Sequence, residues 1–333
     1  MSNAAYLEFN IKDQLLYVLK YLLKNDRDSN ERFSRELNFY LKFNNQNPFI
    51  CKFYGQTQNS NYNIIIIEYI EGISLFDYIS SEFDKLKKYE KIRIILEIMC
   101  AFEFLHLNNI LDKHIYRDLK HTNIMIDSKK NAILIDFDQS KFYTDDQQTG
   151  DIGCDFFASI EQIRSNKYSF KSDVYSIGKI ILFILTKTTF SINSENKVDK
   201  KHLQGFEDLF YIAKSCLNDS PELRTNISFA FNRIFHLAFS NQEYYANNES
   251  FLCDLFKYRE KLFNIHISGN PISKDMLDIS NFLGESYYIN SKIGILDINK
   301  AIHYLTFSAN HNDSYRQYCL GSIYFVGLFI SRN

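Results

Sequence analysis

Three side chains between residues 118 and 136 have the chemistry to act together on a hydroxyl group. Asp118 and Asp136 are carboxylates, and Asn123 supplies an amide oxygen. Carboxylate and amide oxygens are ligands that hard divalent cations prefer, and a carboxylate that holds no metal can accept the proton of a hydroxyl group. We therefore expect Asn123 and Asp136 to share one cation and Asp118 to act on a hydroxyl group.

A predicted β-hairpin brings these side chains together. The apolar runs 124–126 and 133–135 are joined by a polar turn, a pattern that is typical of an antiparallel hairpin. The start of one strand then lies beside the end of the other. Asn123 and Asp136 therefore meet at the open end of the hairpin, with Asp118 one loop away. A surface hairpin with incidental carboxylates is the alternative interpretation.

This stretch resembles two motifs of the protein kinases. The sequence Y-R-D-L-K-H-T-N at 116–123 is similar to the catalytic loop H-R-D-x-K-x-x-N, and D-F-D at 136–138 is similar to D-F-G. The resemblance implies that Asp118 orients the acceptor hydroxyl group and that Lys120 neutralises the transferring phosphoryl group. It also implies two magnesium ligands, Asn123 and Asp136.

Two positions depart from the kinase pattern. Tyr116 replaces a histidine that is mostly a packing residue in the family, and Asp138 replaces a glycine. Asp tolerates positive φ better than most residues, although glycine is the residue with the greatest backbone freedom. The second replacement therefore places a side chain where the family benefits from having none.

A lysine and a glutamate upstream match the kinase device for holding the α- and β-phosphates of ATP. Lys20 ends Tyr17-Val18-Leu19-Lys20, which resembles the V-A-I-K strand, and Glu36 follows within a helical pattern. The resemblance also places Val18 above adenine. The alternative is that Lys20 is ordinary surface charge.

The glycine-rich loop that covers the phosphates in this family is not found before Lys20. Asn3 and Ala5 fall where its last glycine and the following valine stand. We therefore expect a small lobe that lacks its first strand, a chain that is truncated at both ends, and weak binding of ATP because backbone donors to the phosphates are missing.

The hinge between the two kinase lobes is expected at 68–72. The preceding run Ile64–Ile67 is continuously apolar, which is typical of a buried strand. By the resemblance, the backbone groups of Glu68 and Ile70 hydrogen-bond adenine.

Three further residues match positions that stabilise the helical lobe of kinases. Glu161 is the glutamate of the A-P-E motif, and Arg224 is its expected partner. Asp173 matches the aspartate that binds the backbone of the catalytic loop, and a role as a helix N-terminal cap is compatible with that function. Cys154 stands where serine/threonine kinases have threonine, which weakens a hydrogen-bond donor beside Asp118.

Composition excludes several classes of protein. The chain has 38 basic and 40 acidic residues and a formal net charge of −2, so that no overall field favours nucleic acid or membrane surfaces. Its six cysteines are scattered without a C-x-x-C pair, which is typical of reduced thiols inside a cell. No signal peptide or apolar run long enough to span a bilayer is found. We expect an intracellular, cytoplasmic protein.

A second module is predicted near the C-terminus. The pattern Leu283-Gly284-x-x-Tyr287 recurs as Leu320-Gly321-x-x-Tyr324, with Asp297–Leu305 between the two copies. This arrangement resembles Sel-one-like repeats, which are helical relatives of the tetratricopeptide family. An unrelated helical hairpin is the alternative.

We therefore expect an α+β, two-lobed protein kinase fold followed by a fragment of an all-α solenoid. The expected parts are a kinase domain at 1–238 (N-lobe 1–67, hinge 68–72, C-lobe 73–238), a linker with one helix at 239–272, and truncated repeats at 273–333.

The expected function is magnesium-dependent transfer of the γ-phosphate of ATP to Ser or Thr hydroxyl groups of protein substrates. The chain resembles the tyrosine-kinase-like group most closely, and Lys120 implies Ser/Thr acceptors. The alternatives are a pseudokinase scaffold and an adaptor whose helical repeats bind a protein partner.

Overall fold

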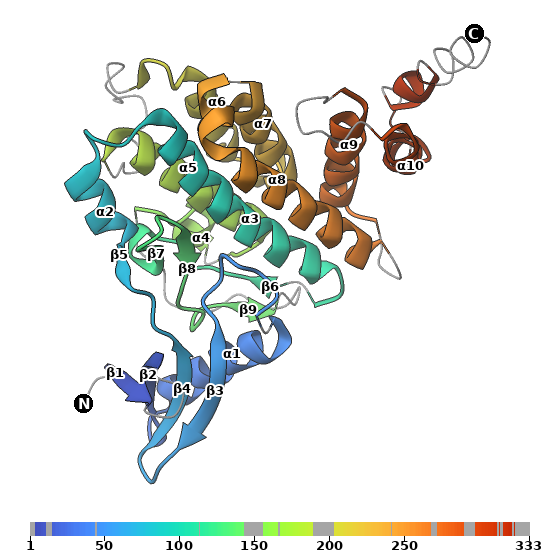
Figure 1. Cartoon of the computed structure of the whole chain (residues 1–333). Coiled ribbons are helices and arrows are strands. Elements are labelled where there is room, and N and C mark those ends of the chain that lie inside the picture. Colours follow the sequence, from blue (N-terminus) through green and yellow to red (C-terminus); the bar gives the residue numbers. More distant parts are fainter. Residues whose placement is uncertain are drawn as a thin grey trace. The chain divides into compact units, whose positions relative to one another are not determined.

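The computed structural model describes residues 4–10, 15–43, 45–112, 114–142, 156–165, 167–188, 203–240, 242–267, 272–289, 297–311, 313, 316–321 and 323. The chain divides into two compact units, Met1–Thr225 (unit 1) and Asn226–Asn333 (unit 2) (Figure 1). The domain boundaries expected at 238 and 272 stay predictions, because this division reflects internal packing alone.

Unit 1 begins with an antiparallel sheet. Its strands lie in the order β1-β2-β4-β3, and their bounds are β1 (Ala4–Asn10), β2 (Leu15–Leu23), β3 (Phe53–Gln58) and β4 (Tyr62–Glu68). The strand expected at 64–67 is thus confirmed, and residues 17–20 lie on a strand as their resemblance to the V-A-I-K strand implies. Strand β2 is central, because it pairs with both β1 and β4, and Lys20 lies opposite Ala5 on one side and Ile65 on the other.

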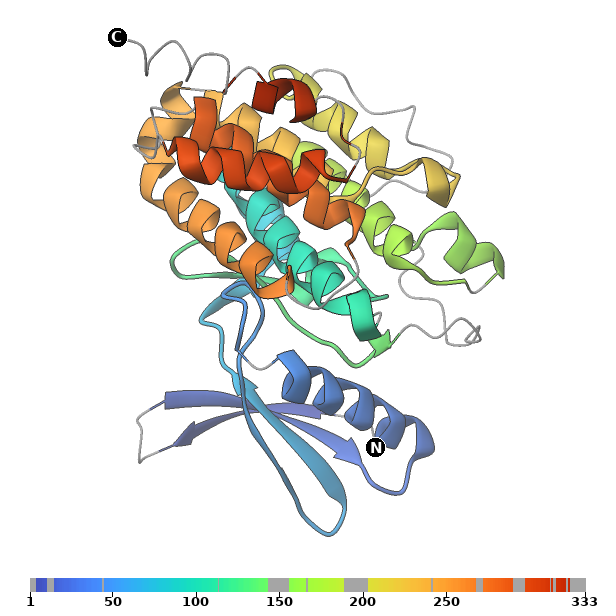
Figure 2. The ribbon, with the colours of Figure 1, turned by 90° about the vertical axis from the view of Figure 1, so that its right-hand side faces the viewer.

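Helix α1 (Arg27–Phe43) lies alongside this sheet (Figure 2). Its start is capped by Asp26, whose carboxylate accepts a hydrogen bond from the backbone N–H of Ser29 at 2.9 Å. Its buried residues include Glu36, Phe39, Tyr40 and Phe43, and this spacing forms one face of a helix. Glu36 is therefore carried into the interior by the same face that buries three aromatic rings.

The rest of unit 1 is mainly helical. Its helices are α2 (Leu75–Glu82), α3 (Lys88–Asp112), α4 (Ile160–Ser165), α5 (Phe170–Thr186) and α6 (Glu207–Cys216), and its short 3₁₀ turns are η1 (His121–Asn123) and η4 (Pro221–Leu223). Helix α5 is buried all around, as its continuous apolar run predicts. A Cβ atom at Gly178 would lie 2.8 Å from Cγ of Leu217, so that only glycine allows α5 this close approach.

Short strands connect these helices. Their bounds are β5 (Gly72–Ser74), β6 (His114–Ile115), β7 (Ile124–Asp127), β8 (Ala132–Leu134) and β9 (Lys141–Phe142). The expected hairpin is confirmed as β7 and β8, with Ile124 opposite Leu134. Its turn is closed by Asp127, whose Oδ1 accepts hydrogen bonds from the backbone N–H groups of Lys129 at 2.9 Å and Asn131 at 2.7 Å.

The described part of unit 2 is helical. It contains α7 (Ile227–Ser240), α8 (Gln242–His266), α9 (Lys274–Ile289) and α10 (Ile298–Ala309), and α8 lies within 239–272, where one helix is expected. A Cβ atom at Gly284 on α9 would lie 2.7 Å from Cγ of Leu305 on α10. The glycine of the first L-G-x-x-Y copy thus permits close contact of two helices, whereas Tyr324 of the second copy lies outside the described residues.

No helix in the described ranges combines the length and the apolar character that crossing a membrane requires.

Candidate active site

Lys20 joins three separate elements of unit 1. Its Nζ donates to the two carboxylate oxygens of Glu36 at 2.8 and 2.9 Å and to Oδ1 of Asp136 at 2.8 Å. The side chain of Glu36 is completely buried, whereas that of Asp136 is one-third exposed. One ammonium group therefore links strand β2, helix α1 and the segment that follows β8.

The charges of this cluster shift one another's pKa values. Burial alone disfavours the ammonium of Lys20, but the charges of Glu36 and Asp136 outweigh it and raise the pKa of Lys20. Burial likewise favours the neutral form of Asp136, but Lys20 dominates and lowers the pKa of that carboxyl group. For Glu36 burial dominates, and it raises the pKa to about 7 although Lys20 acts in the opposite direction. Lys20 and Asp136 are thus held charged at neutral pH.

The catalytic-loop residues gather around Asp118. Nζ of Lys120 donates to Oδ2 of Asp118 at 2.6 Å. Nδ2 of Asn123 donates to the backbone oxygen of Asp118 at 3.0 Å and to its Oδ2 at 3.1 Å. Because Asn123 turns its amide nitrogen toward Asp118, its amide oxygen is the atom left for another ligand.

The backbone of this loop is held by Asp173, at the first turn of α5. Its two carboxylate oxygens accept hydrogen bonds from the backbone N–H groups of Tyr116 at 3.1 Å and Arg117 at 3.0 Å. Asp173 is buried, so that these bonds are shielded from water. The arrangement fixes the path of the chain immediately before Asp118.

Two residues of the site have left-handed backbone conformations. The φ angles are 75° at Arg117 and 63° at Asp136, and such conformations in non-glycine residues cluster at functional sites. Asp138, which replaces the glycine of the kinase motif, is not among the described residues with positive φ. The replacement therefore causes no left-handed strain at Asp138.

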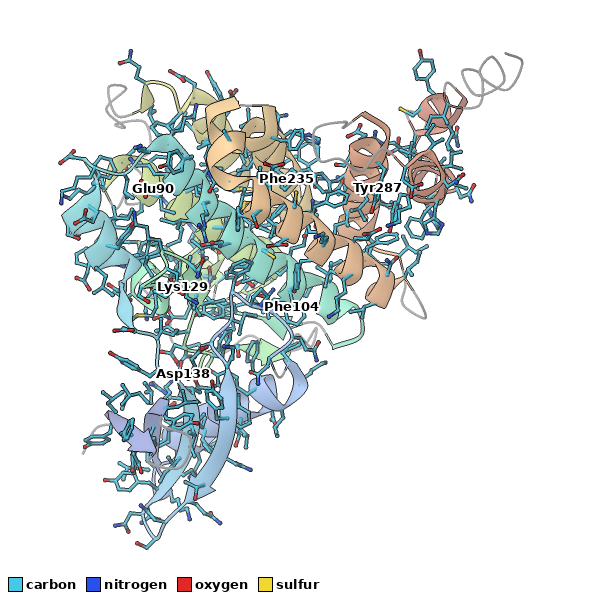
Figure 3. The ribbon with its side chains drawn as sticks, in the orientation of Figure 1. Glu90, Phe104, Lys129, Asp138, Phe235 and Tyr287 are labelled. Atoms are coloured by element: carbon cyan, nitrogen blue, oxygen red, sulfur yellow. The ribbon has the colours of Figure 1, made fainter. Side chains whose placement is uncertain are left out.

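Asp138 instead contacts helix α1, at the place where the sheet meets the helical part of unit 1 (Figure 3). Nε of Arg35 donates to its backbone oxygen at 2.7 Å, and Nη1 of Arg32 lies 3.5 Å from its Oδ2. Neither arginine is expected in the site from the sequence. Their helical pattern placed them on α1, but no local pattern shows that they reach a residue about a hundred positions later.

An aromatic stack connects the same two elements. The rings of Phe39 and Phe137 are parallel, with centroids 3.7 Å apart, and Tyr116 meets Phe137 edge-on at 5.4 Å. The hydroxyl group of Tyr116 donates to the backbone oxygen of Ile135 at 2.6 Å. Tyr116, in the position of the family's histidine, thus packs and also holds the chain that leads to Asp136.

Glu161 and Arg224 form an ion pair in the helical part of unit 1. Nη1 and Nη2 of Arg224 contact Oε1 and Oε2 of Glu161 at 2.6 and 2.7 Å. The hydroxyl group of Ser172 also donates to Oε1 at 2.9 Å. Burial is the largest single influence and would raise the pKa of Glu161, but the hydrogen bonds to its carboxylate and the charge of Arg224 together outweigh it and lower that pKa.

The residues expected near adenine lie along β2 and just after β4. Val18 lies opposite Ile67 in the pairing of β2 with β4. Glu68 ends β4, where its carboxylate accepts from Nζ of Lys52 at 2.8 Å, and Ile70 is buried two residues later. Cys154 lies outside the described residues.

The class of protein to which this site belongs follows from a match to a known protein family. A model of the protein kinase domain matches residues 2–261. The chain belongs to the protein kinase family. The sheet with α1 is the small lobe of a two-lobed kinase fold, and the helical remainder of unit 1 belongs to the large lobe.

Several curated kinases are similar over part of this kinase chain. The serine/threonine-protein kinase PrkC of Bacillus subtilis (strain 168) is 29% identical over 61% of the chain and 31% of its own length. A probable serine/threonine-protein kinase, the KIN1 homolog of Enterocytozoon bieneusi (strain H348), is 32% identical over 50% of the chain and 27% of its own length. The receptor-like kinase GSO1 of Arabidopsis thaliana is 29% identical over 51% of the chain and 14% of its own length. The chain thus spans less than a third of the length of each.

Proposed function

We propose that this kinase chain transfers the γ-phosphate of ATP to Ser or Thr hydroxyl groups of protein substrates. The observation that carries the proposal is the bridge from Lys20 to Glu36 and Asp136, beside a loop in which Asp118 contacts Lys120 and Asn123. Similarity to kinases named as serine/threonine-specific supports the choice of acceptor.

The donor atoms of the site fit magnesium. Asn123 offers an amide oxygen and Asp136 a carboxylate held in its charged form. Magnesium is usually bound by one or two carboxylates together with waters and the phosphates of a substrate, so that this small donor set suffices. When bound, Mg²⁺ supplies positive charge that offsets the charge of the phosphate oxygens.

The chain's own residues would act on the phosphates and on the acceptor. Lys20, positioned by Glu36, binds oxygens of the α- and β-phosphates. Asp118 orients the acceptor hydroxyl group and accepts its proton. Lys120 lies 2.6 Å from Oδ2 of Asp118 and is placed to neutralise the phosphoryl group during transfer.

Adenine would bind where β4 leads into the hinge. The proposed hydrogen-bonding groups are the backbone groups of Glu68 and Ile70, and Val18 would cover one face of the ring. Support comes from position: Val18 on β2 is paired with the residue that precedes Glu68 on β4.

The test of this function is the variant Asp118→Asn. Without a carboxylate to accept the proton, transfer of phosphate from radiolabelled ATP to a mixture of casein and histone should fall by roughly 10²–10⁴-fold. Binding of magnesium–ATP, measured by calorimetry, should persist. The exposed Asp84→Asn variant is the matched control and should behave as the parent. Equal turnover of the parent and Asp118→Asn would refute the proposal.

A pseudokinase scaffold is the second candidate. The feature in its favour is Cys154, which stands where the resemblance expects a threonine, since a thiol is a weaker hydrogen-bond donor than a hydroxyl group. A parent chain that binds magnesium–ATP but transfers no phosphate would establish this alternative. Peptides with Ser, Thr or Tyr acceptors would test the acceptor class and the proposed kinship with the tyrosine-kinase-like group.

The helical module is proposed to be a Sel-one-like repeat that binds a protein partner. The support is the close contact of α9 and α10 at Gly284. Glycine at this point of a recurring pattern is what a helical repeat needs to bring its two helices together.

A further inference from the structure

Helices α8 and α10 of unit 2 line an open cleft with a volume of about 720 Å³. The lining residues of α8 lie between 257 and 265 and those of α10 between 300 and 304, in both cases three and four positions apart. Residues at this spacing share one face of a helix. The cleft therefore lies between two continuous helical faces.

Aromatic contacts hold these two faces in place. Tyr304 of α10 meets Phe263 of α8 edge-on, with ring centroids 5.4 Å apart. It also stacks on Tyr287, which is labelled on α9 in Figure 3, with ring centroids 5.9 Å apart and an interplanar angle of 7°. Tyr304 is buried. Side chains that are packed against one another therefore form the bottom of the cleft.

Glu260 is the one carboxylate among the described residues that line the cleft, and it already has hydrogen-bond partners within the protein. Oε1 of Glu260 accepts hydrogen bonds from the hydroxyl groups of Tyr287 at 2.7 Å and Tyr304 at 2.9 Å, and from Nζ of Lys300 at 2.9 Å. Burial would raise the pKa of Glu260, but these hydrogen bonds outweigh it and lower that pKa. The carboxylate of Glu260 therefore compensates the charge of Lys300, and its hydrogen bonds link α8 to α9 and α10.

The cleft is also lined by two lysines other than Lys300. Lys257 and Lys261 lie one helical turn apart on α8 and are exposed. Neither has a hydrogen-bond or ion-pair partner within the described ranges. Because Glu260 balances only Lys300, the cleft carries an excess of two positive charges. Beside them Ile265 is 57% exposed, which places an apolar surface next to the two ammonium groups.

Resting on the proposed role of the helical module in binding a protein partner, we propose that this cleft binds an acidic stretch of that partner. Two carboxylates of the partner pair with Lys257 and Lys261, and an apolar side chain of the partner packs on Ile265. An acidic peptide supplies both kinds of group in one short segment. Nucleic acid fits less well, because Glu260 lies in the wall and the formal net charge of the chain is −2, so that no wider positive field attracts a phosphate backbone.

The test is selection of peptides by the full 333-residue chain. A phage-displayed library of random dodecapeptides is panned against the parent and against a variant that carries both Lys257→Glu and Lys261→Glu. The parent should enrich sequences with at least two acidic residues near an apolar residue, and the double variant should lose this class. Enrichment of the same acidic class by both proteins, or of no acidic class by the parent, overturns the proposal.

The selected peptide is then labelled with fluorescein and its affinity is measured by fluorescence anisotropy. Each single variant, Lys257→Glu and Lys261→Glu, should weaken binding at least tenfold. The matched control Arg233→Glu, which reverses an exposed charge on α7, should stay within twofold of the parent. Binding should also weaken as salt rises from about 50 to 300 mM, because the charged groups are exposed to solvent.

Two results contradict the proposed occupant at this stage. An equal loss of affinity in Arg233→Glu would show that only net charge matters. Tighter binding of a single-stranded RNA oligonucleotide than of the peptide, with the same dependence on Lys257 and Lys261, would assign the cleft to nucleic acid instead. Circular dichroism of each variant checks that the helices persist.

Discussion

Glu161 and Arg224 are joined by two parallel hydrogen bonds, of 2.6 and 2.7 Å, although 63 residues separate them in the chain. The side chain of Arg224 is completely buried. Its remaining donors are also used, because Nε donates to the backbone oxygen of Asn218 at 2.7 Å, Nη1 to that of Lys171 at 2.8 Å and Nη2 to that of Asp219 at 3.4 Å. The pair therefore ties the start of α4 to the turn around η4 and leaves Arg224 dependent on its partners.

Removing one member of this pair should be costly. We expect Glu161→Gln or Arg224→Met to lower the free energy of unfolding by about 3–5 kcal/mol, because each change leaves a buried group without its charge partner. Urea unfolding of both single variants and the double variant gives the coupling energy of the cycle. The exposed pair Glu82–Lys85 is the control, and its loss should cost less than about 1 kcal/mol. Strictly additive effects of Glu161→Gln and Arg224→Met would disprove the coupling.

Lys20 should determine the affinity for nucleotide. In Lys20→Met the phosphates lose a charge-assisted hydrogen bond worth about 1.5–3 kcal/mol, so that the Kd for magnesium–ATP should rise by roughly 10-fold or more. Calorimetry on folded protein measures this change. Lys24→Met, one residue beyond β2, is the control and should bind as the parent does. Unchanged affinity in Lys20→Met would remove Lys20 from the nucleotide site.

Arg35 should stabilise the segment around Asp138. The variant Arg35→Met removes the donor to the backbone oxygen of Asp138 and should cost about 1.5–3 kcal/mol in the free energy of unfolding. Arg27 on the same helix is 94% exposed and pairs with Glu31 at 3.1 Å. Arg27→Met should therefore cost at most about 0.5 kcal/mol. Chemical unfolding that shows equal losses in the two variants would mean that the contact with Asp138 contributes nothing.

Part of the site could be predicted from sequence because motif spacing constrains it. The hydrogen bond from Lys20 to Asp136 was not expected, and the sharing of one cation by Asn123 and Asp136 stays a prediction. The order of Asp118, Asn123 and Asp136 around a polar turn indicates a hairpin whose open end joins them, and β7 and β8 form that hairpin. The pair of Lys20 and Glu36 follows from the resemblance to the protein kinases, and a hydrogen bond of 2.8 Å joins the two side chains.

Contacts to backbone acceptors, and contacts between residues far apart in the chain, leave no comparable pattern in the sequence. The carbonyl of Asp138 accepts from Arg35 across 103 positions, and any residue type would offer the same carbonyl. The stacking of Phe39 on Phe137 likewise depends on how α1 is oriented. The cleft between α8 and α10 could not be predicted either. Helical periodicity shows that Lys257 and Lys261 share one face of a helix, but it does not show which helix lies opposite that face.

Glu97 provides a pH-dependent test of the core of unit 1. Its side chain is completely buried on α3. Oε1 accepts from Nε of Arg93 at 2.9 Å, and Oε2 accepts from the backbone N–H of Ala132 at 2.7 Å. Burial is the largest influence and raises the pKa of Glu97 from 4.5 to about 7, against the opposing effect of these two hydrogen bonds.

A folded-state pKa that is raised means that the folded chain binds the proton more tightly than the unfolded chain. The stability that Glu97 contributes is therefore fully present below about pH 4.5 and is lost as the pH rises through about 7. Glu97→Gln cannot ionise and should lack this loss. We expect the free energy of unfolding of the parent to fall relative to Glu97→Gln between pH 5 and 8, by at most roughly 3 kcal/mol at about 1.4 kcal/mol per pH unit. Urea unfolding at several pH values measures the difference, in which groups shared by both proteins cancel. Parallel stability curves across this range would show that Glu97 is already ionised in the folded chain, held by Arg93.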